Sequence, residues 1–240
     1  MNMPTTRPGL RFRPLVWALL LGCILTYPFS PAVSRPPGDK RDYILVINTY
    51  AESTPWSRGI IADITAHVEQ IENLELYTEH MTLLLVDSPE DIRTFETNLL
   101  REYGKKPPQA LVLIGTPAAL LRNFINSIWQ DIPTIVCAEQ DFIGPDKYYL
   151  KRQPIPASEQ VPLRALADQD NLTLLYSPAY LDQSVDLMKR ILPGMDRLVF
   201  IDDARYVNRQ TEHDLAKLLG SKSVSYTHLR AHEPLRHLVC

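Results

Sequence analysis

The sequence predicts an α/β fold in which a parallel β-sheet lies between two layers of helices, as a three-layer sandwich. From residue 42 onward, short apolar segments of β-forming residues alternate with longer segments whose apolar residues recur at helical spacing. The first β segment, YILVINTY, is almost continuously apolar, which is typical of a parallel strand buried on both faces. This alternation predicts right-handed crossovers, with a first lobe at 42–175 and an incomplete second lobe at 176–222.

The first lobe opens with a predicted strand over 43–50, YILVINTY. LELYTEHM, at 74–81, is predicted to form the second strand. A helix over 58–71 is expected between them, because apolar residues at helical spacing form one face: Ile60, Ile61, Ile64, Val68 and Ile71.

The following helix, over 87–104, carries its own start and stop signals. Ser88 is the expected N-cap, Pro89 takes the first helical position, and Asp91 completes a capping box. Gly104 is expected to end the helix. The residues predicted to face inward are Ile92, Phe95, Leu99 and Tyr103.

A third strand over 110–115 and a fourth over 132–137 flank a predicted helix over 116–129. Thr116 and Pro117 are the start signals of that helix. Residues 138–170 then break the alternation. This stretch is rich in Pro, Gln and Asp and is too long for a routine turn, which predicts either a crossing segment or part of a site.

A second βα set follows the irregular stretch. It comprises predicted strands over 171–177 and 196–203, and predicted helices over 180–192 and 209–219. So few elements cannot bury a sheet, and their unpaired edges would invite association.

Composition places the chain among ordinary globular proteins. Its 240 residues are 45% hydrophobic and 22% charged, which fits one or two domains. The formal net charge is −3, and no run of Lys and Arg is interleaved with aromatic residues. A nucleic-acid partner is therefore disfavoured.

Residues 1–34 read as a signal peptide or an N-terminal membrane anchor. Three arginines precede the apolar run LVWALLLGCIL, and small residues suited to cleavage follow it at Ala32 and Ser34. LLGC also resembles a lipobox that would lipidate Cys23, but the apolar sequence continues after Cys23, which favours a small apolar residue of the signal core. Each alternative predicts that the rest of the chain works in the periplasm or otherwise outside the cytoplasm, and we expect the parent protein to be membrane-associated.

Residues 223–240 raise the question of a metal site. His228, His232, His237 and Cys240 are all potential zinc ligands, and the first two stand at helical i, i+4 spacing. However, SVSYTHLRAHE, at 223–233, resembles a translated sequencing adapter, so we expect a non-native tail and no metal. The chain would then be the N-terminal part of a longer protein. Cys137 remains as a lone cysteine in a strand, and we expect it to be buried without a disulfide.

The loops that follow the predicted strands are the expected ligand site, because open parallel sheets bind ligands at the carboxyl ends of their strands. The first loop, TYAESTPWSRG, is rich in aromatic and hydroxyl side chains that suit a small polar ligand. Trp56 is either a stacking platform or a hydrophobic plug over the helix start. Thr116 and Pro117 cap a helix whose N-terminus can also hold an anionic group.

No catalytic motif is present in the sequence: there is no Gly-rich phosphate loop, no GxSxG elbow and no HExxH. Glu139 and Asp202 could serve an exported α/β hydrolase or transferase, but neither has an evident partner. We therefore expect no catalytic residues and no cofactor.

Four segments together resemble a known family: ILVINTYAESTPWSRGI, LVLIGTPAA, IPTIVCAEQDF and LVFIDDARY. They are similar to the ABC-transporter substrate-binding-like domain, of the type I periplasmic-binding-protein fold. This domain lies outside the membrane in some bacterial two-component sensor histidine kinases, often hybrids with a response regulator. The resemblance implies a ligand held between two lobes by Tyr50, Glu52, Ser53, Trp56, Ser57, Gly115, Thr116, Glu139, Asp203, Arg205 and Tyr206.

The resemblance implies the ligand-sensing domain of such a kinase, and the parent protein could form a homodimer. No kinase motif occurs in this chain, so phosphotransfer is not assigned to it. The alternative from the same family is a solute-binding lipoprotein of an ABC transporter.

Overall fold

A five-stranded parallel sheet forms the centre of the structure, a computed structural model that describes residues 41–167, 171–195, 197–203, 205–219 and 224–228. Its strand order is β2-β1-β3-β4-β7, and every neighbouring pair is parallel. The order reverses between β1 and β3, which places a topological switch point there. The strands are β1 (Asp42–Asn48), β2 (Leu74–His80), β3 (Ala110–Ile114), β4 (Thr134–Ala138) and β7 (Leu172–Tyr176).

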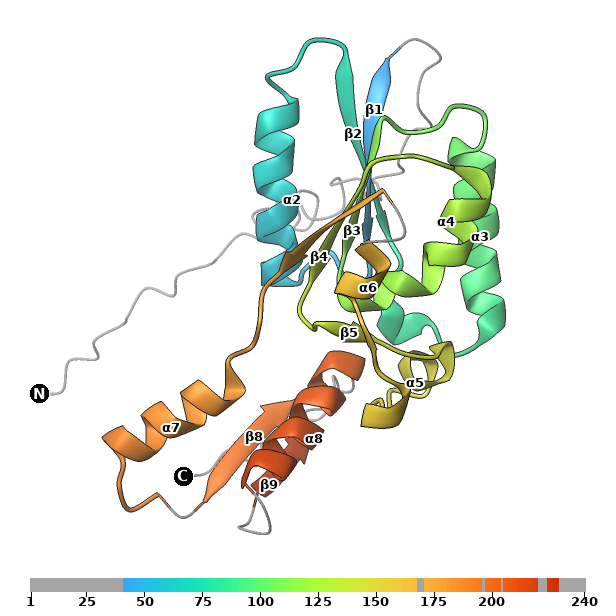
Figure 1. Ribbon diagram of the computed structural model, residues 1–240. Helices are drawn as coiled ribbons and strands as arrows, with labels where there is room; N and C mark the ends of the chain where they lie inside the picture. The colour runs from blue at the N-terminus through green and yellow to red at the C-terminus, as the bar shows by residue number, and fades with distance from the viewer. Residues whose placement is uncertain (1–40, 168–170, 196, 204, 220–223, 229–240) are drawn as a thin grey trace, which may run out of the picture. The chain divides into compact units, whose positions relative to one another are not determined.

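Helices cover both faces of this sheet, as Figure 1 shows. Helix α2 (Pro55–Val68) lies on one face, and α3 (Pro89–Tyr103) and α4 (Arg122–Ile128) lie on the other. Successive strand residues feed opposite layers: Val46 belongs to the core on the α2 side, whereas Leu45 belongs to the core on the α3 and α4 side. The predicted three-layer α/β class is confirmed.

Helix α3 begins and ends at the residues that the sequence signals predict. The Ser88 hydroxyl accepts a hydrogen bond from the Asp91 N–H at 3.3 Å, and the Asp91 carboxylate accepts one from the Ser88 N–H at 2.9 Å. Gly104 ends the helix with an ordinary right-handed φ of −65°. Helix α2 begins earlier than expected, at Pro55, and ends before Ile71, whose side chain is 54% exposed.

Residues 116–129 differ from the single helix that was predicted. Thr116–Leu121 form a 3-10 turn, η2, and only then does α4 begin. The Ala118 N–H bonds to the Gly115 carbonyl at 3.0 Å, an i to i+3 contact that tightens the turn. Thr116 is also tied to the loop after β4, because its hydroxyl accepts a hydrogen bond from the Gln140 N–H. These tertiary contacts favour the tighter turn.

The irregular stretch after β4 is built from short elements that pack onto the core. Its aliphatic and aromatic side chains Tyr149, Ile155 and Leu163 are buried. Strands β5 (Phe142–Ile143) and β6 (Val161–Pro162) pair antiparallel. The helical pieces are α5 (Asp146–Leu150), η3 (Ala157–Glu159) and α6 (Arg164–Ala167). Another short element, the 3-10 helix η1 (Leu83–Leu85), follows β2.

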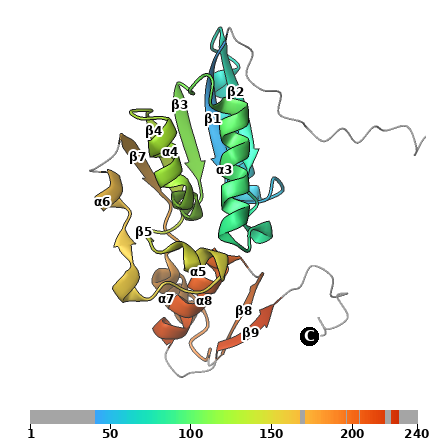
Figure 2. The same cartoon turned by 90° about the vertical axis from the view of Figure 1, so that its right-hand side faces the viewer.

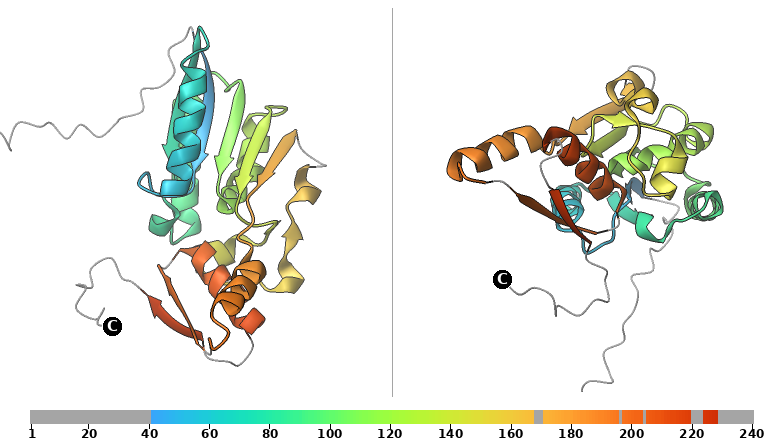
Figure 3. Two further views of the ribbon diagram at one scale, coloured as in Figure 1. Left: turned by 90° about the vertical axis from the view of Figure 1, so that its left-hand side faces the viewer. Right: turned by 90° about the horizontal axis from the view of Figure 1, so that it is seen from below.

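The last described elements are α7 (Leu181–Ile191), β8 (Leu198–Asp202) and α8 (Tyr206–Leu219) (Figures 2 and 3). Helix α8 begins three residues before the predicted helix and packs its Tyr206 ring against Tyr149, with ring centroids 4.5 Å apart. A hydrogen bond of 2.9 Å from the Ile155 N–H to the Gln210 side chain adds to this contact. The start of α8 is therefore anchored to the irregular stretch.

Strand β9 (Val224–His228) pairs in parallel with β8 and forms a separate two-stranded sheet. This pairing differs from the expectation that residues 223–240 are a non-native tail outside the fold. Its physical reason is that an edge strand offers backbone N–H and C=O groups to any segment of sufficient β-propensity. β8 has such an open edge, and its Val199 and Ile201 side chains are more than half exposed.

The predicted signal peptide or anchor at 1–34 lies outside the described residues. Among the helices that the structure does describe, none combines the length and apolar character needed to cross a membrane. Cys137 is a free cysteine and is buried as expected, and this burial raises the pKa of its thiol.

Candidate ligand-binding site

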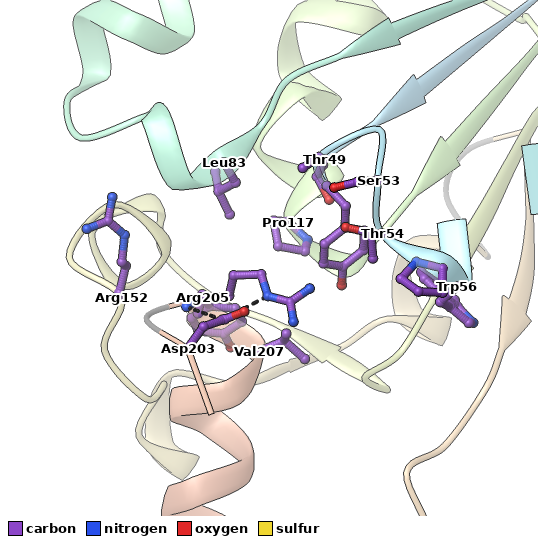
Figure 4. A pocket seen from close by; sticks show the side chains of 14 residues that line it. Thr49, Ser53, Thr54, Trp56, Leu83, Pro117, Arg152, Asp203, Arg205 and Val207 are labelled. Carbon is purple, nitrogen blue, oxygen red and sulfur yellow. Dashed lines mark hydrogen bonds and ion pairs between the residues drawn. The ribbon is translucent and has the colours of Figure 1, made fainter. Parts of the chain in front are cut away.

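A cavity of about 600 Å³ opens at the carboxyl ends of the strands, next to the β1/β3 switch point. The loop after β1 supplies half of its wall, and the segment around the start of α8 supplies the opposite part (Figure 4). The lining residues are Thr49, Tyr50, Ala51, Ser53, Thr54, Pro55, Trp56, Leu83, Pro117, Arg152, Asp203, Arg205, Tyr206 and Val207.

Asn48, the last residue of β1, holds the first loop in place. Its side-chain oxygen accepts a hydrogen bond from the Tyr50 N–H at 3.1 Å, and its side-chain nitrogen donates to the Ser57 hydroxyl at 3.3 Å. The Tyr50 and Trp56 rings then meet edge to face, with centroids 5.8 Å apart and planes at 87°. Since Asn48 is fully buried, these bonds give the cavity a fixed aromatic wall.

Gly115 is required by the close approach of the turn after β3 to the first loop. Its φ is +98°, a conformation that side chains disfavour. A Cβ atom at this position would lie 2.2 Å from the Thr49 hydroxyl oxygen. That hydroxyl donates a hydrogen bond of 3.0 Å to the Ile114 carbonyl. The bare glycine backbone therefore allows Thr49 and Tyr50 to reach the cavity.

Glu139, just after β4, is a buried carboxyl group beside this wall. Burial raises its pKa, and hydrogen bonds from the Thr116 N–H and the Tyr50 hydroxyl only partly offset that effect. The Thr116 N–H lies 2.9 Å from Oε2, whereas Oε1 is buried without a hydrogen-bond partner among the described residues. The pKa of Tyr50 is raised as well, first by burial and then by Glu139.

Asp203 organises the opposite wall. One of its carboxylate oxygens accepts hydrogen bonds from the Arg205 N–H at 3.0 Å, from Arg205 Nε at 2.8 Å and from Asn208 Nδ2 at 2.8 Å. Burial opposes ionisation of this carboxyl group, but the bonds from Arg205 outweigh it and lower its pKa. The Arg205 guanidinium carbon lies 5.9 Å from the centre of the Tyr50 ring, so it reaches toward the first wall.

The structure brings six of the eleven predicted site residues together in the cavity wall: Tyr50, Ser53, Trp56, Asp203, Arg205 and Tyr206. Glu52 is exposed on the first loop and does not line the cavity. Ser57 is buried and donates to the Thr54 carbonyl at 3.3 Å. Gly115, Thr116 and Glu139 form the turn network beside the wall rather than the wall itself. A binding role for these eleven residues stays a prediction.

Trp56 has features of both alternatives that the sequence left open. It lines the cavity, and it is also partly buried against the core on the α2 side. The edge-to-face contact between Trp56 and Tyr50 joins the cavity wall to this core.

Leu83, Arg152 and Val207 also line the cavity but were not among the predicted site residues. Leu83 and Val207 follow strands β2 and β8, but their apolar side chains carry no signal of a polar ligand site. Leu83 belongs to η1 and Val207 to the first turn of α8. Arg152 comes from the irregular stretch, where it has a positive φ of 52° and forms an ion pair with Asp87. The length of that stretch was the available signal, but it does not indicate which side chain reaches the cavity.

In the described part of the chain, the residues of the alternative catalytic and metal sites are not brought together. Asp202 is buried at the end of β8, and neither it nor Glu139 lines the cavity. Within the described ranges, no group of three or more His, Cys, Asp or Glu residues could hold a metal ion. His232, His237 and Cys240 lie outside those ranges, and His228 ends a strand rather than a helix.

Comparison with known proteins leaves the family open. No protein-family model and no curated protein matches this chain. A solved structure that aligns with it is the ABC domain in complex with L-Trp from Streptococcus pneumonia, at 13% sequence identity and a TM-score of 0.43. The alignment covers 79% of this chain and 57% of that chain, so the chain spans little more than half of that protein.

Proposed function

We propose that this chain is a small-ligand-binding domain that holds its ligand between the first α/β lobe and the beginning of a second. The observation that carries the proposal is the cavity of about 600 Å³, lined on one side by the loop after β1 and on the other by Asp203, Arg205, Tyr206 and Val207. Pockets for small molecules typically measure about 300–1,000 Å³ and combine apolar walls with a few polar groups. This cavity has both properties.

The position of the cavity supports the same function. Open parallel sheets bind ligands outside the carboxyl ends of their strands, at a switch point such as the one between β1 and β3. A ligand touching both walls would also stabilise a closed arrangement of the two lobes relative to an open one. Binding could thereby be read out by a domain connected to the second lobe.

In the fuller form of the proposal, the domain works outside the cytoplasm as the sensor of a two-component histidine kinase. The export-like residues 1–34 and the four family-like segments support it. The kinase itself would lie outside this chain. The LLGC sequence around Cys23 favours one other candidate, a solute-binding lipoprotein that delivers its ligand to an ABC transporter.

Ligand binding is tested by thermal unfolding of the chain with a library of small polar compounds. A ligand that binds only the folded state should raise the melting temperature further with each increase in its concentration. The added stability should be about 3 kcal/mol at a hundredfold excess over Kd. Mass spectrometry of the recovered ligand should show no change, since we propose binding without turnover. Chemical conversion of the ligand would support the hydrolase or transferase instead.

A matched pair of variants ties the shift to this cavity. Ser53→Trp adds a large ring to the wall and should abolish the shift, whereas Ser127→Trp, on the exposed side of α4, should retain it. Equal shifts in both variants would contradict binding at this site.

The sensor kinase and the solute-binding lipoprotein are distinguished by sequencing the source DNA across the codons for Lys222 and Ser223. A reading frame that continues into a second lobe, a membrane span and a kinase supports the sensor. A stop codon directly after a complete second lobe supports the solute-binding protein. Attachment of lipid to Cys23 would favour the latter independently.

A further inference from the structure

Arg205 presents unused hydrogen-bond donors inside the cavity. Its Nε atom is occupied by Asp203 at 2.8 Å, and 31% of its side chain is exposed. Within the described part of the chain, neither of its two terminal nitrogens has a hydrogen-bond partner. Figure 4 shows these terminal nitrogens on the side of the guanidinium group that faces away from Asp203, among the lining side chains.

The guanidinium group is held in place before any ligand arrives. Asp203 accepts hydrogen bonds from both the Nε and the backbone N–H of Arg205, and Asn208 holds the same carboxylate oxygen at 2.8 Å. The Tyr50 ring limits the guanidinium group from another direction, at 5.9 Å. A restrained side chain loses little conformational entropy when it binds. Its two terminal N–H groups form a planar fork that matches the two oxygens of a carboxylate or phosphate.

The other charged side chains near the cavity are paired or lie outside its lining. Arg152 and Arg205 both line it, whereas Asp203 is the one carboxylate among the described lining residues. The Glu139 carboxyl group is buried outside the lining, and its hydrogen bonds run to Thr116 and Tyr50. Arg152 is paired with Asp87 and Arg205 with Asp203, so the terminal N–H groups of Arg205, and not a net positive charge, are what the wall offers to an anion.

We propose that the ligand carries a carboxylate or phosphate group, and that the two terminal nitrogens of Arg205 bind it in a bidentate manner. This inference rests on the proposed ligand-binding function and specifies its ligand class. Asp203 acts as a positioning residue, because it orients the guanidinium group without reaching the ligand itself.

The test uses three probes that share a phenyl ring and differ in the head group: benzoate, phenyl phosphate and benzamide. Each is titrated at constant ionic strength into the chain, and the assigned indole N–H signal of Trp56 is followed by NMR. At least one of the two anions should bind about tenfold or more tightly than neutral benzamide, since a hydrogen bond to a charged group contributes about 1.5–3 kcal/mol. The tighter anion identifies the head group.

Variants assign this preference to Arg205. Arg205→Gln should lower the affinity for the anion to that for benzamide, and Arg205→Lys, which keeps the charge but loses the fork, should retain only part of it. Arg101→Gln, at an exposed position of α3 outside the cavity, is the matched control and should leave the affinity unchanged. The amide spectrum of each variant checks its folding.

The inference would be overturned by benzamide binding as tightly as the anions, or by an anion preference that survives in Arg205→Gln and Arg205→Lys. Absence of any response to the three probes would overturn it too. The library screen with Ser53→Trp tests ligand binding whatever the charge of the ligand. Neutral ligands found there would leave the binding function in place while refuting the anionic class.

Discussion

Replacement of Gly115 by alanine should destabilise the chain, whereas the same replacement of Gly59 should stabilise it. Gly115 has a φ of +98°, and a Cβ atom there would lie 2.2 Å from Thr49 Oγ1 and 3.0 Å from a ring carbon of Tyr50. Gly59 is exposed in the middle of α2, and a Cβ atom there would meet nothing within 4 Å. One added methyl group thus enters two opposite environments.

The magnitudes follow from these geometries. An alanine held at a sparsely populated positive φ costs about 1–3 kcal/mol. Movement of Thr49 away from the new methyl group would also break its 3.0 Å hydrogen bond to the Ile114 carbonyl, a loss of about 1 kcal/mol. Gly115→Ala should therefore reduce the free energy of unfolding by about 2–4 kcal/mol. Gly59→Ala should increase it by about 0.5–1 kcal/mol, because alanine is the better helix former.

The assay is equilibrium unfolding in urea of the wild type and both variants, with the slope of the transition compared across the three. A change in Gly115→Ala smaller than about 0.5 kcal/mol, the usual range for surface substitutions, would refute the close approach of Gly115 to Thr49. Equal destabilisation by both variants would refute the distinction between the two sites. Since Thr49 and Tyr50 line the cavity, Gly115→Ala should also weaken binding of any ligand found in the library screen.

Three further predictions concern the capping box, the aromatic wall and the buried carboxyl group. Ser88→Ala should lower the free energy of unfolding by about 1 kcal/mol through loss of the bond to the Asp91 N–H, and an unchanged urea midpoint would contradict the cap. Trp56→Ala should cost about 1–2 kcal/mol because the ring is partly buried, and it should weaken ligand binding; complete unfolding would show that the ring is chiefly a plug. The raised pKa of Glu139 means that the folded state binds the carboxyl proton more tightly than the unfolded state does. In the unfolded state the pKa of a glutamate is about 4.3. This contribution to stability is complete below about pH 4 and is lost as the pH rises through the folded-state pKa, so the wild type should lose stability relative to Glu139→Gln over that range. Parallel pH curves of melting temperature for these two proteins would disprove it.

Features that depend on neighbouring residues in the chain could be predicted from the sequence. The α3 start is an example, because Ser88, Pro89 and Asp91 interact with one another and with their own backbone. The central strands β1 and β3 are another, since residues buried on both faces must be apolar whatever covers them. The loops that line the cavity could also be predicted, because the carboxyl ends of parallel strands share one edge of the sheet.

Features that depend on distant residues could not be predicted in this way. The 3-10 turn at Thr116 reflects bonds to Glu139 and Gln140, more than twenty residues away. Arg152 reaches the cavity because an irregular stretch packs its Tyr149 against α8. The β8 and β9 pairing uses backbone groups, which carry little sequence information.

The sequence alone was sufficient for the α/β class, the order of the elements and the loops that surround the site, because hydrophobic periodicity and capping act over a few residues. The tertiary fold was needed to show which side chains of those loops face the cavity. Glu139 and Thr116 turn to each other beside the wall, whereas Arg205 is held by Asp203 with its terminal nitrogens unpaired within the described residues. Side-chain direction at a loop is set by partners from other segments, and those partners are adjacent only after the chain has folded.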